Sequence, residues 1–348
     1  MTINSITIRK PDDCHLHLRD DSILRVVLPY TVSQFARAVI MPNLVTPITT
    51  ISLAESYRNE ILTSCPGEFD FHPLMTCYLT DMTTPKEIEF GFFENVWVAA
   101  KLYPIGVTTN SNQGVTDLIK IAPIFECMEK IGMPLLIHGE TANSDIDIFD
   151  REAVFMENSL LPLLKRYQGL KIVLEHITTN ETIDIVRKYA PRIAGTITPH
   201  HMMLNRTSLF QGGFQPHHYC LPIAKREYHR LALRKAATSG ESCFFIGTDS
   251  APHLRSIKES SCCSAGIFVA ATALQSYAQI FAEECALNQL EAFASLNGAR
   301  FYGLPLNKGT VTLEQNPSRV LKTITIGDDE IVVFRGGELI PWSIKNNK

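Results

Sequence analysis

The sequence predicts an α/β fold: a closed (β/α)8 barrel of parallel strands with a short C-terminal extension packed on it. Short apolar runs that each end in a polar residue recur eight times along the chain. Longer stretches with helical periodicity separate these runs, as in a parallel sheet covered by helices. Eight such units within about 250 residues match the TIM-barrel architecture. An open, doubly wound sheet is the alternative, but no run is followed by the Gly-x-Gly-x-x-Gly motif that would support it.

The polar residues that close the runs are where this fold would place chemistry. The active site of such a barrel lies at the carboxyl ends of its strands. In order, the runs and their closing residues are SITI with His15 and His17, ARAVIMP with Asn43, FDFHPLMTCYL with Thr80, VWVAA with Lys101, MPLLI with His138, KIVLE with His176, RIAGTIT with His200, and CFFIG with Asp249.

Two of the intervening stretches show helical spacing, and the end of the chain shows a different pattern. From about Lys308 onward, short strand-like pieces (TVTLE, VLKTITI and EIVVFR) alternate with glycine turns. These last 40 or so residues are too few for a core of their own, so we expect a single domain over residues 1–348. The residues expected on one helical face are Leu118, Ile121, Phe125 and Met128 in one stretch, and Leu274, Tyr277, Ala278, Phe281 and Cys285 in another.

Composition excludes several classes of function. The 348 residues are 45% hydrophobic, enough for a sizeable core. The net charge of −4 argues against a nucleic-acid partner, which would require a basic surface. No apolar run of about 18 residues could span a membrane, and the first ten residues lack an apolar signal core, so we expect a cytoplasmic protein. None of the nine cysteines forms a Cys-x-x-Cys pair, so we expect reduced thiols.

Histidines at three of the strand ends predict a metal site. On a strand, residues two apart face the same way, so His15 and His17 would point together into the barrel mouth. Taken alone, this spacing often arises by chance. His138, His176 and Asp249 close three further runs, however, and the fold would bring them to the same place. Four histidines and an aspartate exceed what one zinc ion needs and suit a two-metal hydrolase.

Lys101 is the unexpected member of this group, because two divalent metals would repel a cation. An amine desolvated by such neighbours loses its proton more easily. A neutral amine can react with CO₂ to form a carbamate, which is a carboxylate able to bridge two metals. The alternative is a lysine whose amine extends from the strand end into solvent.

In this order, the segments HLHLRD, MPNL, KLYP with TTNS, LIHGE, EHITT, PHHYCLPI, GTDSAPH and KESSC resemble those of the dihydroorotases. The resemblance is to the short, single-domain bacterial type within the amidohydrolase superfamily, and it covers nearly the whole chain. One departure is SSCCSAG, where the family often has SSCGCAG. The resemblance implies reversible cyclisation of N-carbamoyl-L-aspartate to L-dihydroorotate in pyrimidine synthesis, by a homodimer.

The resemblance also implies how the reaction proceeds. A hydroxide that bridges two Zn²⁺ ions per subunit would attack the ring amide, although other divalent metals suit the same ligands. Asp249 would act as general base and then as general acid. Lys101, in its N-carboxylated form, would bridge the metals. The full ligand set implied is His15, His17, Lys101, His138, His176 and Asp249.

The substrate contacts implied by the resemblance centre on a carboxylate. Arg19 follows His17 by two residues, and a guanidinium there can grip a carboxylate through two hydrogen bonds. Residues 105–114 resemble the family's mobile loop, which closes over bound substrate. The contacts implied are the side chains of Arg19, Asn43 and His253 for the carboxylate, the backbone of Leu221 and Ala265 for the ring amide, and in addition Thr108, Thr109 and His138.

Two other functions would fit part of this pattern. A hydantoinase or dihydropyrimidinase would have a similar metal site, but Arg19, Asn43 and His253 make sense only for a substrate that carries a carboxylate. A catalytically silent relative would be expected to have lost metal ligands, whereas all six positions are filled. His200 and His201 follow the seventh run and receive no role.

Overall fold

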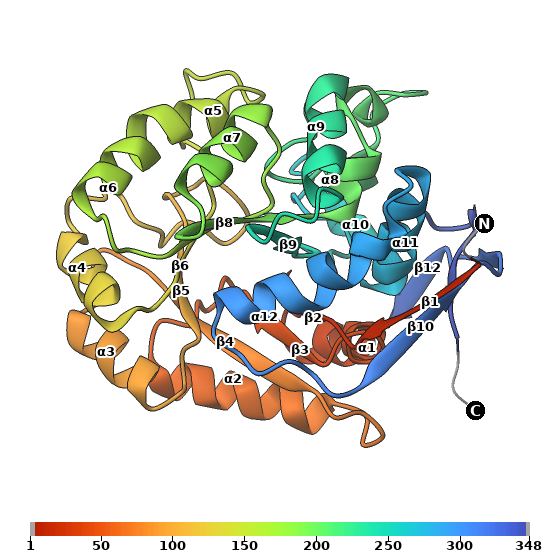
Figure 1. The fold of residues 1–348 in the computed structure, drawn as a ribbon, viewed down its shortest axis with the longest axis horizontal. Helices are drawn as coiled ribbons and strands as arrows, with labels where there is room; N and C mark the ends of the chain where they lie inside the picture. The colour runs from red at the N-terminus through yellow and green to blue at the C-terminus, as the bar shows by residue number, and fades with distance from the viewer. Residues whose placement is uncertain (1–3, 346–348) are drawn as a thin grey trace.

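The computed structural model describes residues 4–345 and contains the expected barrel at its centre (Figure 1). Eight parallel strands pair in chain order from β2 to β9. The barrel closes where the Asp249 amide donates to the His15 carbonyl at 2.9 Å and the His17 amide donates to Ser250 at 3.0 Å. The strands are β2 (Asp12–Leu16), β3 (Arg37–Ile40), β4 (His72–Tyr78), β5 (Ala99–Leu102), β6 (Leu135–Ile137), β7 (Ile172–Leu174), β8 (Ile193–Ile197) and β9 (Phe244–Ile246).

Helices lie outside the strands and cover them. Several begin at a threonine whose side-chain oxygen accepts a hydrogen bond from the third amide of the helix, as Thr50, Thr84 and Thr179 do. Among residues 4–345, no helix has the length and apolar character that crossing a membrane requires. The helices are α1 (Asp21–Val32), α2 (Ile51–Ser64), α3 (Pro85–Phe93), α4 (Ala122–Ile131), α5 (Arg151–Phe155), α6 (Leu161–Arg166), α7 (Asn180–Tyr189), α8 (Pro199–Met203), α9 (Glu227–Ala237), α10 (Arg255–Lys258), α11 (Ala273–Glu283) and α12 (Asn297–Phe301).

The first strand is where the sequence prediction was wrong. SITI belongs to β1 (Ser5–Arg9), which pairs antiparallel with β10 (Thr310–Glu314) outside the barrel (Figure 1). The first barrel strand is β2, whose sequence DDCHL looks polar although all five residues are buried. Asp12 forms a buried ion pair with Arg37, with 2.6 Å between Nη2 and Oδ2. The amide of Thr248 donates to Asp13 at 2.9 Å. These satisfied carboxylates hide a core strand from any hydropathy pattern.

The C-terminal extension packs on the barrel as expected, through small antiparallel sheets. β12 (Thr323–Ile326) and β13 (Asp329–Val332) form a hairpin in which Ile326 pairs with Asp329 across a two-residue turn. A bridge between Leu254 and Ile331 ties the hairpin to the segment after β9. The remaining strands are β11 (Ser318–Arg319), β14 (Leu339–Ile340) and β15 (Ser343–Ile344), of which β15 pairs with β10 and β11 with β14.

The two predicted helical faces are confirmed in their centres and wrong at one end each. Phe125 and Met128 are buried on α4, but Leu118 precedes the helix, which begins with a proline in its first turn. Cys285 follows the end of α11 and is exposed. All nine cysteines lie in the described part of the chain, and none of them is disulfide-bonded.

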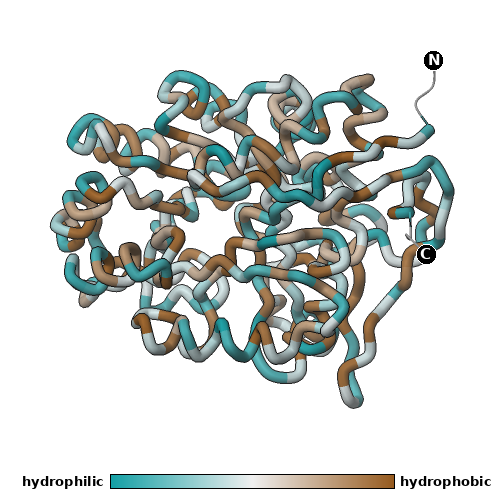
Figure 2. The backbone as a smooth tube through the Cα atoms, turned by 60° about the horizontal axis from the view of Figure 1, so that its bottom comes forward, coloured by the Kyte–Doolittle hydropathy of each residue, from teal (hydrophilic) through white to brown (hydrophobic). Residues whose placement is uncertain are grey.

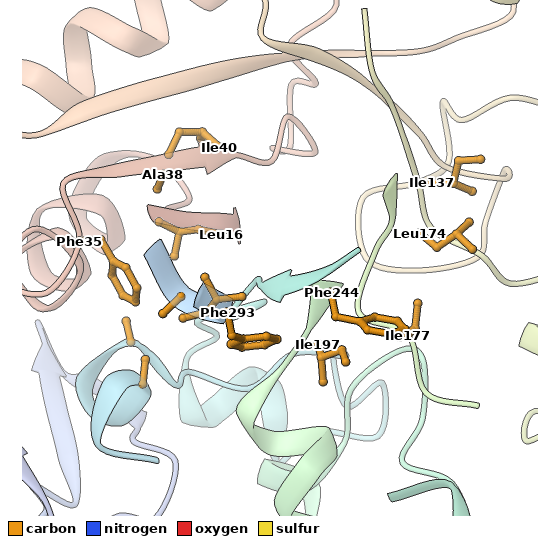
Figure 3. Packing of buried hydrophobic residues seen from close by; sticks show 14 of the residues in the cluster. Leu16, Phe35, Ala38, Ile40, Ile137, Leu174, Ile177, Ile197, Phe244 and Phe293 are labelled. Carbon is orange, nitrogen blue, oxygen red and sulfur yellow. The ribbon is translucent and has the colours of Figure 1, made fainter. Parts of the chain in front are cut away.

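The apolar core has two layers separated by the barrel wall. Ala38 and Ile40 of β3 and Phe244 of β9 belong to the outer layer, between strands and helices (Figure 3). Apolar and polar segments alternate along the chain, as Figure 2 shows, and the helices turn their apolar faces to this layer. The inner layer fills the barrel below the site. It consists of Cys14, Val39, Met41, Ala99, Leu136, Val173, Ala194 and Phe245.

Candidate active site

Polar side chains lie next to the inner apolar layer, toward the carboxyl ends of the strands. Ala99 and Leu136 fill the barrel interior, so Lys101 and His138, two residues further on, face the same way. The side chains of β2 do not alternate regularly, because Cys14 belongs to the inner layer and Leu16, two residues further on, to the outer one. The pairing register shifts between Asp13 and Leu16. This shift turns the histidines on either side of Leu16 toward the interior.

The structure brings the predicted metal donors together. Donor atoms of His15, His17 and Asp249 all lie within 4.8 Å of one another, and all three side chains are buried. The Nε2 atom of His17 is 3.2 Å from Asp249 Oδ1. The imidazole ring of His176 has its centre 5.0 Å from that of His15 and 4.7 Å from that of His138. Four imidazoles and a carboxylate therefore converge at the carboxyl ends of the strands.

Two glutamates that the sequence analysis did not assign orient these histidines. Glu175 Oε2 lies 2.8 Å from His15 Nδ1, and Glu140 Oε2 lies 2.8 Å from His138 Nε2. Each carboxylate accepts a hydrogen bond from one ring nitrogen and leaves the lone pair of the other free, as second-layer partners of metal ligands do. The available signal was a glutamate in each of the segments LLIHGE and VLEHITT, next to or near a histidine.

Unpartnered buried nitrogens show that this group fits a metal. Within residues 4–345, neither His15 Nε2 nor His176 Nδ1 has a hydrogen-bond partner. Burial lowers the pKa of His17 to about 3 despite its hydrogen bond to Asp249, so the ring is neutral and can donate its lone pair. Buried nitrogens without partners are costly. A divalent cation would satisfy them together.

Lys101 is fully buried at the end of β5. Its Nζ has no hydrogen-bond partner in the described chain and lies 5.0 Å from the centre of the Tyr103 ring. Burial lowers the pKa of this amine to about 8, although the carboxylates of Glu175 and Asp249 act in the opposite direction. Roughly a tenth of the amine is therefore neutral at pH 7, and the neutral amine is the form that reacts with CO₂.

Arg19 and His253 form an incompletely satisfied pair beside these histidines. Arg19 is buried, its Nε donates to the Pro252 carbonyl at 3.2 Å, and its Nη1 has no partner among residues 4–345. The Nε2 atom of His253 lies 3.0 Å from Arg19 Nη2 and 2.9 Å from the Ala265 carbonyl. If His253 Nε2 carries a proton, it can donate a hydrogen bond to the Ala265 carbonyl but cannot accept one from Arg19. If it carries no proton, it can accept a hydrogen bond from Arg19 but cannot donate one to the carbonyl. The guanidinium thus retains donors for an anion.

The loop of residues 105–114 lies against the site. Asn43 Nδ2 donates to the Thr109 carbonyl at 3.0 Å, and Thr109 Oγ1 donates to the Ala265 carbonyl at 3.2 Å. Thr108 and Leu221 also line the enclosed cavity. The free volume is about 20 Å³, room for about one water molecule. Seven of the eight predicted substrate contacts thus line this cavity, and the eighth, His253, contacts two of them, Arg19 and Ala265.

Three residues of the site have left-handed backbone conformations. The φ angles are 61° at Arg19, 41° at His176 and 46° at Asp249. This conformation is unfavourable for residues other than glycine, and such strain concentrates at functional sites. The strain sits where a strand ends and a side chain must turn inward, a feature that no sequence pattern revealed.

A second buried group lies after β8. Donor atoms of His200, His201 and Cys220 are also within 4.8 Å of one another. Both nitrogens of His201 are in use, at 2.8 Å from Thr198 Oγ1 and 2.8 Å from the Pro222 carbonyl. Burial raises the pKa of the Cys220 thiol, which keeps it protonated. His200 differs from His201, because neither of its ring nitrogens has a hydrogen-bond partner within residues 4–345. The group therefore has one unpartnered histidine and contains no carboxylate, whereas the first group contains that of Asp249.

Comparison with known proteins agrees with the fold. The model of the amidohydrolase family matches residues 11–331. The dihydroorotase of Edwardsiella ictaluri is 54% identical over 342 residues, which is 98% of each chain. Among solved structures, dihydroorotase from Campylobacter jejuni has a TM-score of 0.90 at 34% identity, over 99% of this chain and 98% of that one. Dihydroorotase from Saccharomyces cerevisiae, in complex with 5-fluoroorotic acid, has a TM-score of 0.91 at 30% identity, over 99% of both chains.

A parallel barrel with a histidine and aspartate group at its carboxyl end, matched over this span, is an enzyme of the amidohydrolase class. The identity to curated relatives narrows the class further. The chain belongs to the dihydroorotase family, and the expectation drawn from its motifs is confirmed.

Proposed function

We propose that this chain interconverts N-carbamoyl-L-aspartate and L-dihydroorotate, the ring-closing step of pyrimidine synthesis, at the site described above. The observation that carries the proposal is the buried guanidinium of Arg19, which has free donors beside the converging histidines. A buried cation with free donors favours an anionic ligand. Both compounds carry a carboxylate, which the uncharged ring of dihydrouracil lacks.

The donor set supports two divalent metal ions per subunit, which we propose to be Zn²⁺. The chemistry that such ions supply when bound is polarisation of the amide carbonyl and activation of water near neutral pH. Lys101 would join the ligands after its neutral amine adds to the carbon of CO₂. In that step an N–C bond forms and the amine proton passes to solvent. The proposed ligands are His15, His17, N-carboxylated Lys101, His138, His176 and Asp249.

Asp249 is the proposed proton carrier. In the hydrolytic direction, a carboxylate oxygen of Asp249 accepts the proton of the attacking water. It then delivers this proton to the ring nitrogen as the C–N bond breaks. Synthesis uses the same groups in reverse. Burial acts to raise the pKa of Asp249, but the imidazoles of His15 at 3.4 Å and His17 at 3.2 Å hold it well below its usual range, so the resting group is a carboxylate ready to act as base.

The other residues orient the substrate. Arg19, Asn43 and His253 would bind its carboxylate, which fixes the ring so that the reacting atoms lie at attack distance. The backbone of Leu221 and Ala265 would meet the ring amide, with Thr108, Thr109 and His138 as further contacts. Because the enclosed volume admits about one water molecule, the loop of residues 105–114 must withdraw for a ring to enter and close again to exclude water.

Turnover of L-dihydroorotate by the purified protein tests the proposal, with dihydrouracil as the uncharged control and bound metal quantified on the same sample. We expect dihydroorotate to be opened, with about two metal ions per chain, and dihydrouracil to react far more slowly. Preference for dihydrouracil would contradict the carboxylate assignment and leave the metal site standing. Absence of both metal and turnover after addition of zinc and bicarbonate would overturn the proposal.

The assembly of the chain is a separate proposal. We infer from the family resemblance that residues 1–348 form one domain and that two copies associate as a homodimer. Sedimentation velocity at several protein concentrations distinguishes the dimer from a monomer of 38.9 kDa.

A further inference from the structure

Lys258, the last residue of α10, is a buried lysine whose charge is satisfied by backbone carbonyls. Its side chain is 3% exposed. Nζ donates to the carbonyls of Tyr219 at 2.8 Å, Ser264 at 2.8 Å and Gly266 at 2.9 Å. Within residues 4–345 it forms no ion pair. An ammonium group has three donors, so these carbonyls use all of them.

The three carbonyls belong to two segments that form one wall of the substrate pocket. Tyr219 precedes Leu221 by two residues, and Ser264 and Gly266 flank Ala265. Leu221, Ala265 and Gly266 line the pocket. The two segments also bond to each other directly, because the Gly266 amide donates to the Tyr219 carbonyl at 3.1 Å. Lys258 therefore links the segment around Tyr219 to the segment around Ala265, which is distant from it in sequence.

The carbonyl of Ala265 and those of its two neighbours in sequence have different partners. The carbonyls of Ser264 and Gly266 accept hydrogen bonds from Lys258, whereas that of Ala265 accepts one from Thr109 at 3.2 Å and lies 2.9 Å from His253 Nε2. The lysine lies on one side of the segment, and the loop and His253 lie on the other.

Gly266 shows how closely this wall is packed. Its φ angle is 147°, and a side chain there would meet the Ala251 carbonyl oxygen at 2.8 Å and His253 at 2.8 Å. The backbone at this point therefore has little freedom to move toward His253. A change behind the wall would be passed to Ala265 and to the ring that Ala265 meets.

We infer that Lys258 is a positioning residue for substrate, whose ammonium group holds the backbone at Leu221 and Ala265 in the conformation that contacts the substrate ring. This inference rests on the proposed function, since it assumes a ring ligand in that pocket. Lys258 touches neither the ring nor the metal donors. Its removal should weaken binding much more than it slows the bond-breaking step.

The substitution K258M tests the inference, because methionine keeps the length and packing of the side chain and removes its donors. Lys225 offers a matched control. It is also buried, and its Nζ donates to a single carbonyl, that of Ile223, at 2.9 Å. The measurements on metal-loaded, full-length protein are KM and kcat for L-dihydroorotate, affinity for 5-fluoroorotic acid by calorimetry, bound metal, and the thermal midpoint.

We expect K258M to raise KM, and to weaken 5-fluoroorotic acid binding, on the order of 10- to 100-fold. Its kcat and metal content should stay close to those of the wild type, and K225M should leave KM within about threefold of the wild-type value. An unchanged KM in K258M overturns the inference. So does a parallel loss of metal, kcat and binding in both variants, which would indicate a general structural role.

A conservative variant and the wild type complete the test. K258R retains the charge, but its donors lie in one plane and differ in geometry from those of an ammonium group, so its KM should lie between those of the wild type and K258M. If K258M does not fold, a raised KM with retained kcat in K258R supports the inference, and a wild-type KM overturns it. An inactive wild type would overturn the proposed function as well, whereas an active wild type with an unaffected K258M overturns the role of Lys258 alone.

Discussion

The two buried clusters at the carboxyl end of the barrel resemble each other by distance and differ in chemistry. His15, His17 and Asp249 form one, His200, His201 and Cys220 the other, and in both the donor atoms lie within 4.8 Å of one another. In the first, a glutamate holds one nitrogen of His15 and leaves the other unpartnered within the described chain. In the second, both nitrogens of His201 are hydrogen-bonded.

Unpartnered nitrogens are present in both clusters, since His200 has two of them within residues 4–345. What distinguishes the first cluster is the carboxylate that fixes the ring of His15 and the carboxylate of Asp249 among its donors. His201 bonds Thr198 and the Pro222 carbonyl, and so ties the end of β8 to the segment that carries Leu221. The ring of His15 is also fixed, but its Nε2 atom lies beside other possible metal ligands, namely Asp249 and His176. We therefore expect metal at the first cluster and not at the second.

Replacing Asp249 should have the largest effect on the first cluster. D249N keeps the shape of the side chain but cannot carry the proton, so kcat for dihydroorotate should fall roughly 10²- to 10⁴-fold. Steady-state kinetics, with bound metal measured in parallel, provide the check. A kcat within threefold of the wild type would show that another group carries the proton.

Loss of the orienting carboxylate should have an intermediate effect. In E175Q, the amide no longer holds His15 as an anionic acceptor, so metal affinity should fall about 10- to 100-fold. Titration against a competing chelator measures this change. If E175Q binds metal as tightly as the wild type, the contrast between the clusters does not depend on ring orientation.

The pH dependence of stability should report the neutral, buried state of His200. Burial, followed by the charge of His201, lowers the pKa of His200 well below 6.5. Between pH 6.5 and 5, the unfolded chain binds a proton at this residue and the folded chain does not, so stability falls as the pH falls. The contribution is at most about 1.4 kcal/mol per pH unit.

The matched variant for this test is H200Q, which removes the titrating group. Urea unfolding of metal-free protein between pH 7 and 5 should show a shallower loss of stability in H200Q than in the wild type. Equal slopes would mean that His200 takes up a proton in the folded state as well.

The smallest effect is expected from the second cluster. C220S replaces a protonated, buried thiol with a hydroxyl of similar size, and metal content should stay at the wild-type value. Elemental analysis of the two proteins, prepared side by side, measures this. Loss of one metal ion per chain in C220S would assign the second cluster as a metal site, and the two clusters would then not differ in function.

Much of the barrel was predictable because seven of its strands are apolar runs that end in a polar residue. The eighth, β2, was hidden because Asp12 and Asp13 are buried with partners from β3 and the end of β9. Those partners lie 25 or more residues away in sequence. No local pattern of hydropathy can contain them.

The sequence was sufficient to predict which residues form the site, but not which contacts they make with one another. His15, His17 and Asp249 follow from strand ends and motif order, and the structure brings them together. The roles of Glu175 and Lys258 depend on which atoms they meet across the barrel mouth. The sequence places each of these residues near the site without showing what it holds.

Anomalous diffraction from crystals of the wild-type protein, recorded on both sides of the zinc absorption edge, tests the central distinction most directly. We expect two peaks among His15, His17, Lys101, His138, His176 and Asp249, and none beside Cys220. A peak between His200, His201 and Cys220, with none beside His15, would contradict this expectation.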